Sequence, residues 1–368
     1  MSSLLIFFVA HSFACRGPAR FAPSDLYNSY MRRCLTSLVL ILASLLVHGQ
    51  IQEAQPVRPK VSLEHAQQLS REGKYDEAIS ELEQLSQSQE IKGLDRELGT
   101  AYYRKGDYPH AIASLTKAVG RDAHDDEATQ LLGLSYYLAG KPSEAIPYLE
   151  RVQTWYPRAN VDASYILGQC YIQTKDYPHA RQAFAKMFDL APDSAGSYLV
   201  TARMLFRQEF GPIALQYAQK AVALDPKLPQ AHFLLGEIHL FQSQIPDAVS
   251  DFQSELELNP GDAATYYKLA DAYSRIQRFD DAERLLQRSI WLDATATGPY
   301  ILLGKVLEKK GEADMALRAL RRAATMDPNN SMTHHLLGQA YRDLGNNEAA
   351  ERELKLAGQL ESGADSKQ

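Results

Sequence analysis

The chain has 368 residues, of which 45% are hydrophobic and 23% charged, and its formal net charge is -6. This length allows two or three ordinary domains or one long repeat array. Nothing suggests the basic stripe that marks a nucleic-acid-binding face, so we expect no nucleic-acid partner. The three cysteines, Cys15, Cys34 and Cys170, are too few and too scattered for a disulfide framework or a zinc site. Cys170 is expected to be a small buried hydrophobe.

The first 49 residues are interpreted as an N-terminal leader. Met31 is followed by Arg32 and Arg33, then by an apolar stretch over residues 35–47 and by Gly49. The apolar stretch is shorter than the roughly 20 residues of a membrane-spanning helix and is typical of a secretory signal peptide. We therefore expect translation to start at Met31, cleavage after Gly49, and an exported protein, periplasmic or secreted.

A second apolar run over residues 4–14 has no Lys or Arg before it. It leaves open a lipoprotein acylated on Cys15, although Ser12 stands where such signals have an aliphatic residue. In that case the chain would be anchored to the membrane through its N-terminus. The Arg32-Arg33 pair resembles a twin-arginine signal only weakly. Residues 50–58 are expected to be a linker, and we expect contact with the membrane only through the leader.

Residues 59–364 repeat with a period of 34. A Leu-Gly pair is followed after three positions by a large residue, nine positions later by an alanine, and four positions later by a bulky apolar residue. The small residue of the pair lies at Gly99, Gly133, Gly168, Ala202, Gly236, Ala270, Gly304 and Gly338. The alanine lies at Ala78, Ala111, Ala145, Ala180, Ala214, Ala248, Ala282, Ala316 and Ala350. The period predicts nine units, 59–91, 92–125, 126–160, 161–194, 195–228, 229–262, 263–296, 297–330 and 331–364, and a tail at 365–368.

Each unit is expected to form two antiparallel helices. Pro109, Pro178, Pro212 and Pro246 stand where the second helix begins, and in a first turn the missing N–H is no loss. Pro147 instead lies inside the expected helix and should kink it or shift its start. Apolar residues three and four positions apart give each helix one apolar stripe, which only a neighbouring unit can cover. The fold class is therefore all-α, a stack of helical hairpins.

The recurring Leu-Gly, Tyr, Ala, Phe and Pro positions resemble the tetratricopeptide repeat (TPR) family over residues 59–364. The resemblance implies a right-handed superhelical solenoid. It also implies that the first helix of each hairpin lines a concave groove that binds a partner. A binding scaffold is expected, and not an enzyme.

Aromatic and basic side chains are expected to line that groove, because these types dominate binding hot spots. They are Tyr103, Tyr137, Tyr165, Arg203, Phe206, Arg207, Phe233, Phe241, Tyr267, Arg275 and Lys305. Packing of some of them in the core is the other interpretation. Some family members bind a C-terminal carboxylate through Lys and Asn one turn apart, but the pair at that place here is Arg96 and Thr100. An extended peptide or a helix with apolar anchors and acidic groups, answering the basic residues and Lys309, fits better.

We find no motif that carries chemistry. A His-Glu-x-x-His sequence, a phosphate loop and a nucleophile elbow are all missing from the sequence. His232 and His239 share a helix face but replace large core residues, so we expect core histidines and no metal. His334 and His335 are adjacent and point to different faces. No cofactor and no enzymatic activity are expected.

The leading hypothesis is an exported adaptor that binds other proteins through its groove. The alternative is a glycan-binding scaffold that supports the export of envelope polysaccharide, since aromatic grooves also stack sugars. The first repeat carries Glu64 and Arg71 and suits a water-facing end. The last has no obvious extra capping helix. Either small residues such as Gly358 make that end tolerable, or a partner or second copy of the chain covers it.

Overall fold

A computed structural model describes residues 61–88, 91–155 and 161–365. The predicted leader, with Met31, Cys15 and the cleavage site after Gly49, lies outside the described residues, as does the linker at 50–58. The chain divides into two units, Met1–Arg58 and Pro59–Gln368. All of the described residues belong to the second unit.

The described residues form eighteen α-helices and no strand. The helices are α1 (Leu63–Arg71), α2 (Tyr75–Ser88), α3 (Leu94–Lys105), α4 (Tyr108–Arg121), α5 (Asp126–Leu138), α6 (Pro142–Trp155), α7 (Val161–Gln173), α8 (Tyr177–Met187), α9 (Ala195–Arg207), α10 (Gly211–Leu224), α11 (Ala231–Phe241), α12 (Ile245–Leu258), α13 (Ala263–Arg275), α14 (Phe279–Leu292), α15 (Thr297–Lys310), α16 (Ala313–Met326), α17 (Ser331–Asp343) and α18 (Asn347–Asp365). The predicted all-α class is confirmed.

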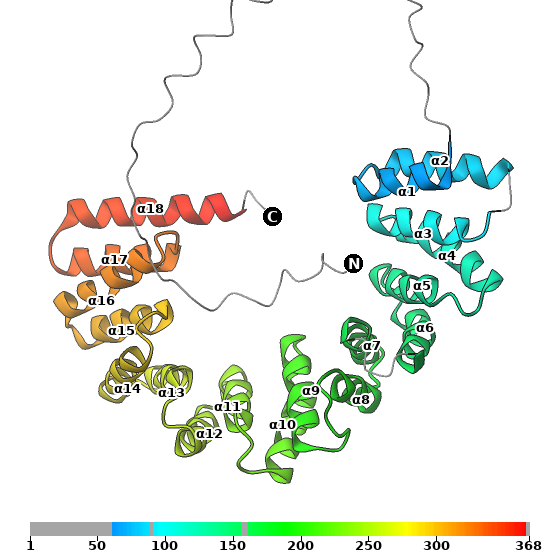
Figure 1. Cartoon of the computed structure of the whole chain (residues 1–368). Coiled ribbons are helices and arrows are strands. Elements are labelled where there is room, and N and C mark those ends of the chain that lie inside the picture. Colours follow the sequence, from blue (N-terminus) through cyan, green and yellow to red (C-terminus); the bar gives the residue numbers. More distant parts are fainter. Residues whose placement is uncertain (1–60, 89–90, 156–160, 366–368) are drawn as a thin grey trace, which may run out of the picture. The chain divides into compact units, whose positions relative to one another are not determined.

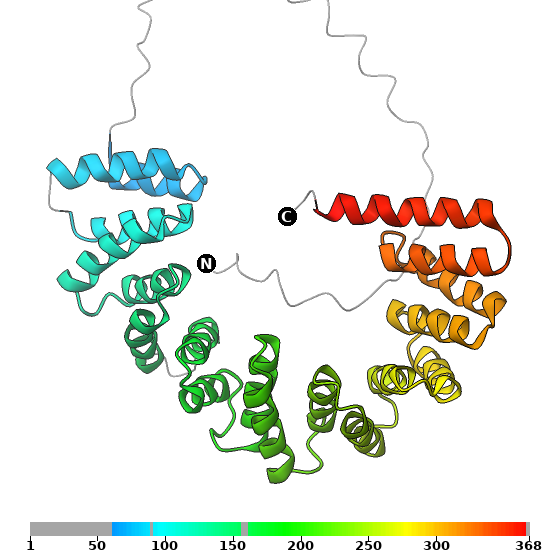
Figure 2. The same cartoon turned by 180° about the vertical axis from the view of Figure 1, so that it is seen from behind.

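Consecutive helices pair into hairpins, and each hairpin packs on the next (Figure 1). Odd-numbered helices of successive hairpins also contact one another, as α11 contacts α13 and α13 contacts α15. Even-numbered helices contact mainly the odd-numbered ones beside them. The odd-numbered helices therefore form the inner side of the stack and the even-numbered ones the outer side, as the reverse view also shows (Figure 2).

Local chemistry explains where the helices begin. Pro109, Pro178, Pro212 and Pro246 all lie in the first turn of an even-numbered helix, as predicted. Side chains cap other helices, as where the Asp125 carboxylate accepts a hydrogen bond from the Ala128 N–H of α5 at 3.0 Å.

Pro147 does not shift the start of its helix. The helix α6 begins at Pro142 and continues through Pro147 to Trp155. A proline at this position removes the N–H that would bond to the carbonyl of Ser143, and Ser143 is exposed. Water can therefore satisfy that carbonyl, which makes the proline tolerable in the second turn.

The glycine of the Leu-Gly pair makes room for a bulky side chain of the second helix. A Cβ added to Gly236 would lie 2.5 Å from Cε1 of Phe252, and one added to Gly168 would lie 2.5 Å from Cε1 of Phe184. Both phenylalanines are fully buried. Where Ala202 replaces the glycine, the corresponding position of the second helix holds the buried Ala218 instead of Leu or Phe. The close approach of the two helices thus rests on a small residue of the first helix, which leaves room for the facing side chain of the second.

Cys170 was predicted to be a small buried residue, and the structure confirms this. Cys170 is fully buried, and burial raises the pKa of its thiol to about 12. Among the described residues, no helix has both the length and the apolar character needed to cross a bilayer.

Candidate functional site

One position in each repeat supplies the exposed residue of the inner face. It lies five residues after the small residue of the Leu-Gly pair, near the end of the odd-numbered helix. The residues at this position are Arg104, Leu138, Gln173, Arg207, Phe241, Arg275, Lys309 and Asp343, and all are exposed. One residue earlier, Ile172 and Leu240 are buried and Phe206 is half-buried. This position therefore supplies an exposed side chain of the odd-numbered helix in each of these eight repeats.

An aromatic pair lies on two adjacent inner helices. The rings of Phe206 on α9 and Phe241 on α11 meet edge to face, with centroids 5.7 Å apart and an interplanar angle of 85°. Phe241 keeps 67% of its surface exposed, whereas Phe206 also packs on the core. An exposed aromatic ring held in place by a second ring is a preorganised apolar anchor point.

A basic cavity of about 680 Å³ follows between α13 and α15. Its lining consists of Asp271, Ser274, Arg275, Gln277, Phe279, Lys305 and Lys309. Arg275 is held by Asp271, with its Nη2 2.9 Å from Oδ2 of the carboxylate, and its Nη1 lies 3.5 Å from the carbonyl oxygen of Leu240. The guanidinium therefore lies beside the residue that precedes Phe241. No ion pair involves Lys305 or Lys309 in the described part of the chain, so the cavity keeps a positive charge.

A smaller cavity of about 300 Å³ continues along α15 and α17 and shares Lys309 with the first. Glu308, Gln339, Arg342 and Asp343 complete its lining. The Oε1 atom of Glu308 is buried and has no hydrogen-bond partner among the described residues. Burial, with a smaller contribution from the Asp343 carboxylate, raises the pKa of Glu308 to about 7.

We call Phe206, Phe241, Arg275, Lys305 and Lys309 the inner-face site.

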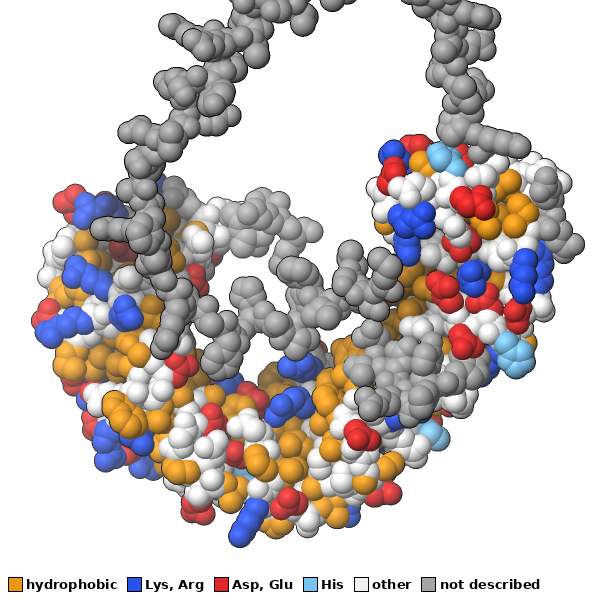
Figure 3. All heavy atoms as spheres, viewed as in Figure 1, with side chains coloured by type: hydrophobic (Ala, Val, Ile, Leu, Met, Phe, Trp, Pro, Cys, Tyr) orange, Lys and Arg blue, Asp and Glu red, His pale blue; other side chains and the backbone are white. Residues whose placement is uncertain are grey.

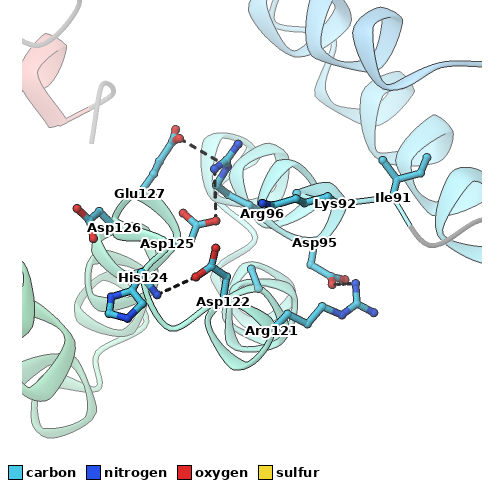
Figure 4. A pocket seen from close by; sticks show the side chains of 12 residues that line it. Ile91, Lys92, Asp95, Arg96, Arg121, Asp122, His124, Asp125, Asp126 and Glu127 are labelled. Atoms are coloured by element: carbon cyan, nitrogen blue, oxygen red, sulfur yellow. Dashed lines mark hydrogen bonds and ion pairs between the residues drawn. The ribbon is translucent and has the colours of Figure 1, made fainter.

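A larger cavity, of about 1070 Å³, lies beside α3, α4 and the start of α5 (Figure 4). Both of its arginines are already paired. The Arg96 guanidinium lies 3.3 Å from the Asp125 carboxylate and 3.6 Å from that of Glu127, and Arg121 pairs with Asp95. The cavity also holds more acidic than basic side chains, so it offers an acidic ligand less than the cavity with Lys305 and Lys309 does. We therefore place the candidate site in the basic cavity and its aromatic neighbours.

The structure brings together six of the eleven groove residues predicted from sequence. Phe206, Phe241, Arg275 and Lys305 belong to the inner-face site, and Arg203 and Arg207 lie on α9 with Phe206. The other five do not join them.

Three of these five are tyrosines on α3, α5 and α7. Tyr103 and Tyr137 are half-buried, and Tyr165, which is 38% exposed, packs against Phe184 with centroids 6.4 Å apart. Phe233 packs against the buried Phe252, with centroids 5.9 Å apart, and Tyr267 lies in the same apolar cluster. These two side chains mainly fill the core.

The sequence did not single out Gln277 and Phe279, which line the basic cavity, or Gln339 and Arg342, which line the smaller cavity beside it. Gln277 and Phe279 lie at the loop that joins α13 to α14, outside the first helices to which the groove was assigned. Asp343 occupies in α17 the exposed repeat position that Phe241 occupies in α11. Arg342 directly precedes Asp343, so the repeat pattern could have pointed to it.

The histidines of α11 do not gather around a metal site. Nδ1 of His239 lies 2.6 Å from the Asp251 carboxylate on α12, and Nε2 of His232 lies 3.2 Å from the Pro226 carbonyl oxygen. His334 is buried and pairs with Glu353, while the adjacent His335 is exposed. In the part of the chain that the structure describes, no group of three His, Cys, Asp or Glu side chains is placed to hold a metal ion.

Comparison with family models identifies the class of repeat. The model described as tetratricopeptide repeat matches residues 63–123, 199–263, 238–299 and 301–361, which is more than half of the chain. The protein therefore belongs to the tetratricopeptide repeat family. A second model, anaphase-promoting complex, cyclosome, subunit 3, matches residues 104–187.

Several solved structures match the chain at low sequence identity. The crystal structure of MamA is 24% identical, with a TM-score of 0.42 over 45% of this chain and 96% of that one. The APC/C hetero-tetramer Cut9-Hcn1 is 20% identical, with a TM-score of 0.43 over 75% and 54%. YrrB, described as a TPR protein with an unusual peptide-binding site, is 23% identical, with a TM-score of 0.42 over 49% and 93%. No curated protein matches the chain.

Proposed function

We propose that this protein is an interaction scaffold whose inner-face site binds an extended segment of a partner protein. The observation that carries the proposal is the succession of an exposed aromatic anchor, Phe241, and a basic cavity with two unpaired lysines. A segment with an apolar side chain followed by carboxylates matches this order.

The apolar part of the proposed binding is the contact with Phe241. Its ring is 67% exposed and is braced by Phe206, so a partner side chain could cover it without rearranging the helix. Full burial of a side chain of this size contributes roughly 1.5 to 3 kcal/mol. Because the ring is already held in place, little side-chain entropy would be lost on binding.

The charged part of the proposed binding is the contact with Lys305 and Lys309. Both side chains are exposed and line the cavity, and neither has a carboxylate partner in the described residues. Arg275 is oriented by Asp271 before any ligand arrives. Acidic groups of the partner would meet basic groups that are available, which favours an acidic segment over a neutral glycan.

Export is part of this proposal. It is supported by the apolar stretch over residues 35–47 after Arg32 and Arg33. N-terminal sequencing of the protein from its native source tests it, and a mature chain that begins at Gln50 supports cleavage after Gly49. A chain that retains residues 31–49 contradicts it.

A displayed library of random peptides tests the binding proposal. We expect enrichment of peptides with an aromatic or aliphatic residue followed within a few positions by Asp or Glu. The Phe241→Ala and Lys305→Ala, Lys309→Ala variants should lose the enriched peptides. Leu138→Ala is the matched control, because Leu138 is exposed at the same repeat position of α5. Equal loss in the control, or selective binding of glycans and no peptide, would contradict the proposal.

A further inference from the structure

The outer face of the last three repeats differs in charge from that of the first six. At the position two residues after the repeat alanine, the last three repeats carry Arg284 on α14, Arg318 on α16 and Arg352 on α18. The same position in the first six repeats holds Ser80, Ala113, Pro147, Gln182, Gln216 and Ser250. A second row adds Arg321 and Lys355 three residues later, where the first six repeats have no basic residue. Arg288 and Arg322 lie on the same helices, at a position that is also basic in four of the first six repeats, as Lys117, Arg151, Lys186 and Lys220.

Most of these arginines have no acidic partner. Arg284 pairs with Asp281 and Arg352 with Glu348, but Arg288, Arg318 and Arg322 form no ion pair among the described residues. Arg321 donates hydrogen bonds to the Tyr341 hydroxyl at 2.7 and 3.0 Å and therefore keeps its charge. Figure 3 shows Lys and Arg side chains along the outer edge of the stretch formed by α14, α16 and α18. The same helices also carry exposed acidic residues, Asp280, Asp314, Glu348 and Glu351, so the unpaired arginines are concentrated on this face but do not fill it.

Exposed apolar side chains lie among the arginines. Trp291 on α14 has 71% of its surface exposed, and the guanidinium carbon of Arg288 lies 4.2 Å from the centroid of its ring. Met315 on α16 is 43% exposed and Leu356 on α18 is 36% exposed. Arg284, Arg288 and Trp291 are spaced four and three residues apart, so they share one side of α14. We call Arg284, Arg288, Trp291, Arg318, Arg321, Arg322, Arg352 and Lys355 the outer arginine face.

We propose that the outer arginine face binds the surface of a bilayer that contains anionic phospholipids. Guanidinium groups bind phosphate oxygens in a bidentate manner, and basic side chains near an anionic leaflet are attracted to its surface potential. Tryptophan favours the headgroup region, where its ring meets the acyl chains and its N–H meets water. The arginines thus match the phosphate groups of the bilayer, and the tryptophan matches the boundary between its headgroups and acyl chains.

The placement on the outer side favours a membrane over a peptide. These residues come from three successive outer helices, so they are spread over an extended surface, in contrast to the aromatic pair and the cavity of the inner face. A continuous anionic surface can meet all three helices at once. The negative charge of the rest of the chain would be repelled by the same surface, so that only one orientation is favoured.

Vesicle binding of the full chain tests the proposal. Vesicles of phosphatidylcholine with 30% phosphatidylglycerol are the probe, in low salt, against vesicles of phosphatidylcholine alone. The Arg288→Ser, Arg322→Ser double variant should bind the anionic vesicles roughly 25-fold more weakly, about fivefold for each arginine removed. The apolar stretches near the N-terminus are present in every variant, so they cannot produce this difference.

The matched control is the Lys117→Ser, Lys220→Ser double variant. These lysines are exposed at the same repeat position of α4 and α10, so the charge change is identical and only the location differs. The control should bind like the unaltered chain, and circular dichroism melting should show that both double variants remain folded. An equal loss of binding in the two double variants would show a net-charge effect and would overturn the proposal.

Trp291 gives a second, independent readout. The chain has two tryptophans, so Trp155→Phe leaves Trp291 as the sole indole fluorophore. We expect its emission to shift to shorter wavelength with anionic vesicles and to be quenched by brominated lipids. An unshifted spectrum while the protein is bound would overturn the proposal. So would binding of a single-stranded RNA, or self-association of the chain, that depends on these arginines while vesicles are not bound.

Discussion

The inner-face site and the outer arginine face both combine aromatic and basic residues, but they differ in how these residues are held. On the inner face Phe241 is braced by Phe206, and Arg275 is fixed by Asp271 beside a cavity of about 680 Å³. On the outer face Arg318 and Arg322 have no ion-pair partner in the described residues, and Trp291 is 71% exposed. A concave, preorganised surface suits a defined segment, whereas an open surface of unpaired charges suits an extended target. One helical stack can therefore carry two different binding modes on its two sides.

The largest effect is expected where the two faces share a core. Phe252 is fully buried on α12 and fills the space against Gly236 of α11. Phe252→Ala should lower the free energy of unfolding by about 3 to 5 kcal/mol, because it leaves a cavity between an inner and an outer helix. Chemical denaturation followed by circular dichroism measures this. Peptide and vesicle binding should both be lost, and retention of either would show that the faces are independent of this core.

Salt should weaken binding at the two faces to different extents. Raising NaCl from 0.05 to 0.5 M shortens the screening length from more than 10 Å to about 4 Å. Vesicle binding through Arg288, Arg318 and Arg322 should fall by about tenfold or more, since these charges are exposed and unpaired. Peptide binding at the inner-face site should fall by about threefold or less, because Phe241 provides an apolar part that salt does not weaken. Vesicle flotation and fluorescence anisotropy give the two values, and equal salt dependence would contradict the distinction.

The pH dependence of the free energy of unfolding should report on a residue of the inner face, Glu308. The folded chain raises the pKa of Glu308 to about 7, mainly by burial. Between pH 4.5 and about 7 the unfolded chain has lost a proton that the folded chain keeps, so the contribution of Glu308 to stability falls as pH rises. Glu308→Gln should therefore gain stability relative to the unaltered chain across this range and keep that gain above pH 7.

Thermal melting of both proteins at several pH values measures this difference. Glu257→Gln, which alters an exposed residue of α12, is the control. A difference between Glu308→Gln and the unaltered chain that does not change with pH would contradict the assignment.

The smallest effect on stability is expected for the two exposed aromatic residues. Phe241→Ala and Trp291→Ala should each change the free energy of unfolding by no more than about 0.5 kcal/mol, since surface substitutions usually stay within this range. Each should weaken only the binding of its own face. A large loss of stability in either variant would mean that its side chain supports the fold and is not free for a ligand.

The repeat pattern predicted much of this structure because each consensus residue has a local reason. The prolines in the first turns of α4, α8, α10 and α12 and the glycines that face Leu or Phe follow from backbone chemistry and size alone. The groove residues were harder to select. Phe233 and Phe241 lie on the same short helix, yet one packs against Phe252 and the other is 67% exposed. Their difference depends on the helix rotation relative to its neighbours, which residue type does not encode.

The outer arginine face was also hidden from composition. A net charge of -6 gave no sign of a basic surface, because the charge averages over nine repeats that differ from one another. The aligned positions of Arg284, Arg318 and Arg352 carried the signal, but only the known pairing of the helices shows that these residues lie on one side.

The amino-acid sequence by itself determined the repeat period, the helical hairpins and the family, because these depend on residue spacing and local propensity. The tertiary structure alone decided which Phe is exposed and which lies in the core, and where unpaired lysines meet in a cavity between α13 and α15. Exposure and charge pairing are properties of neighbouring helices in space. They become visible only when the hairpins are stacked.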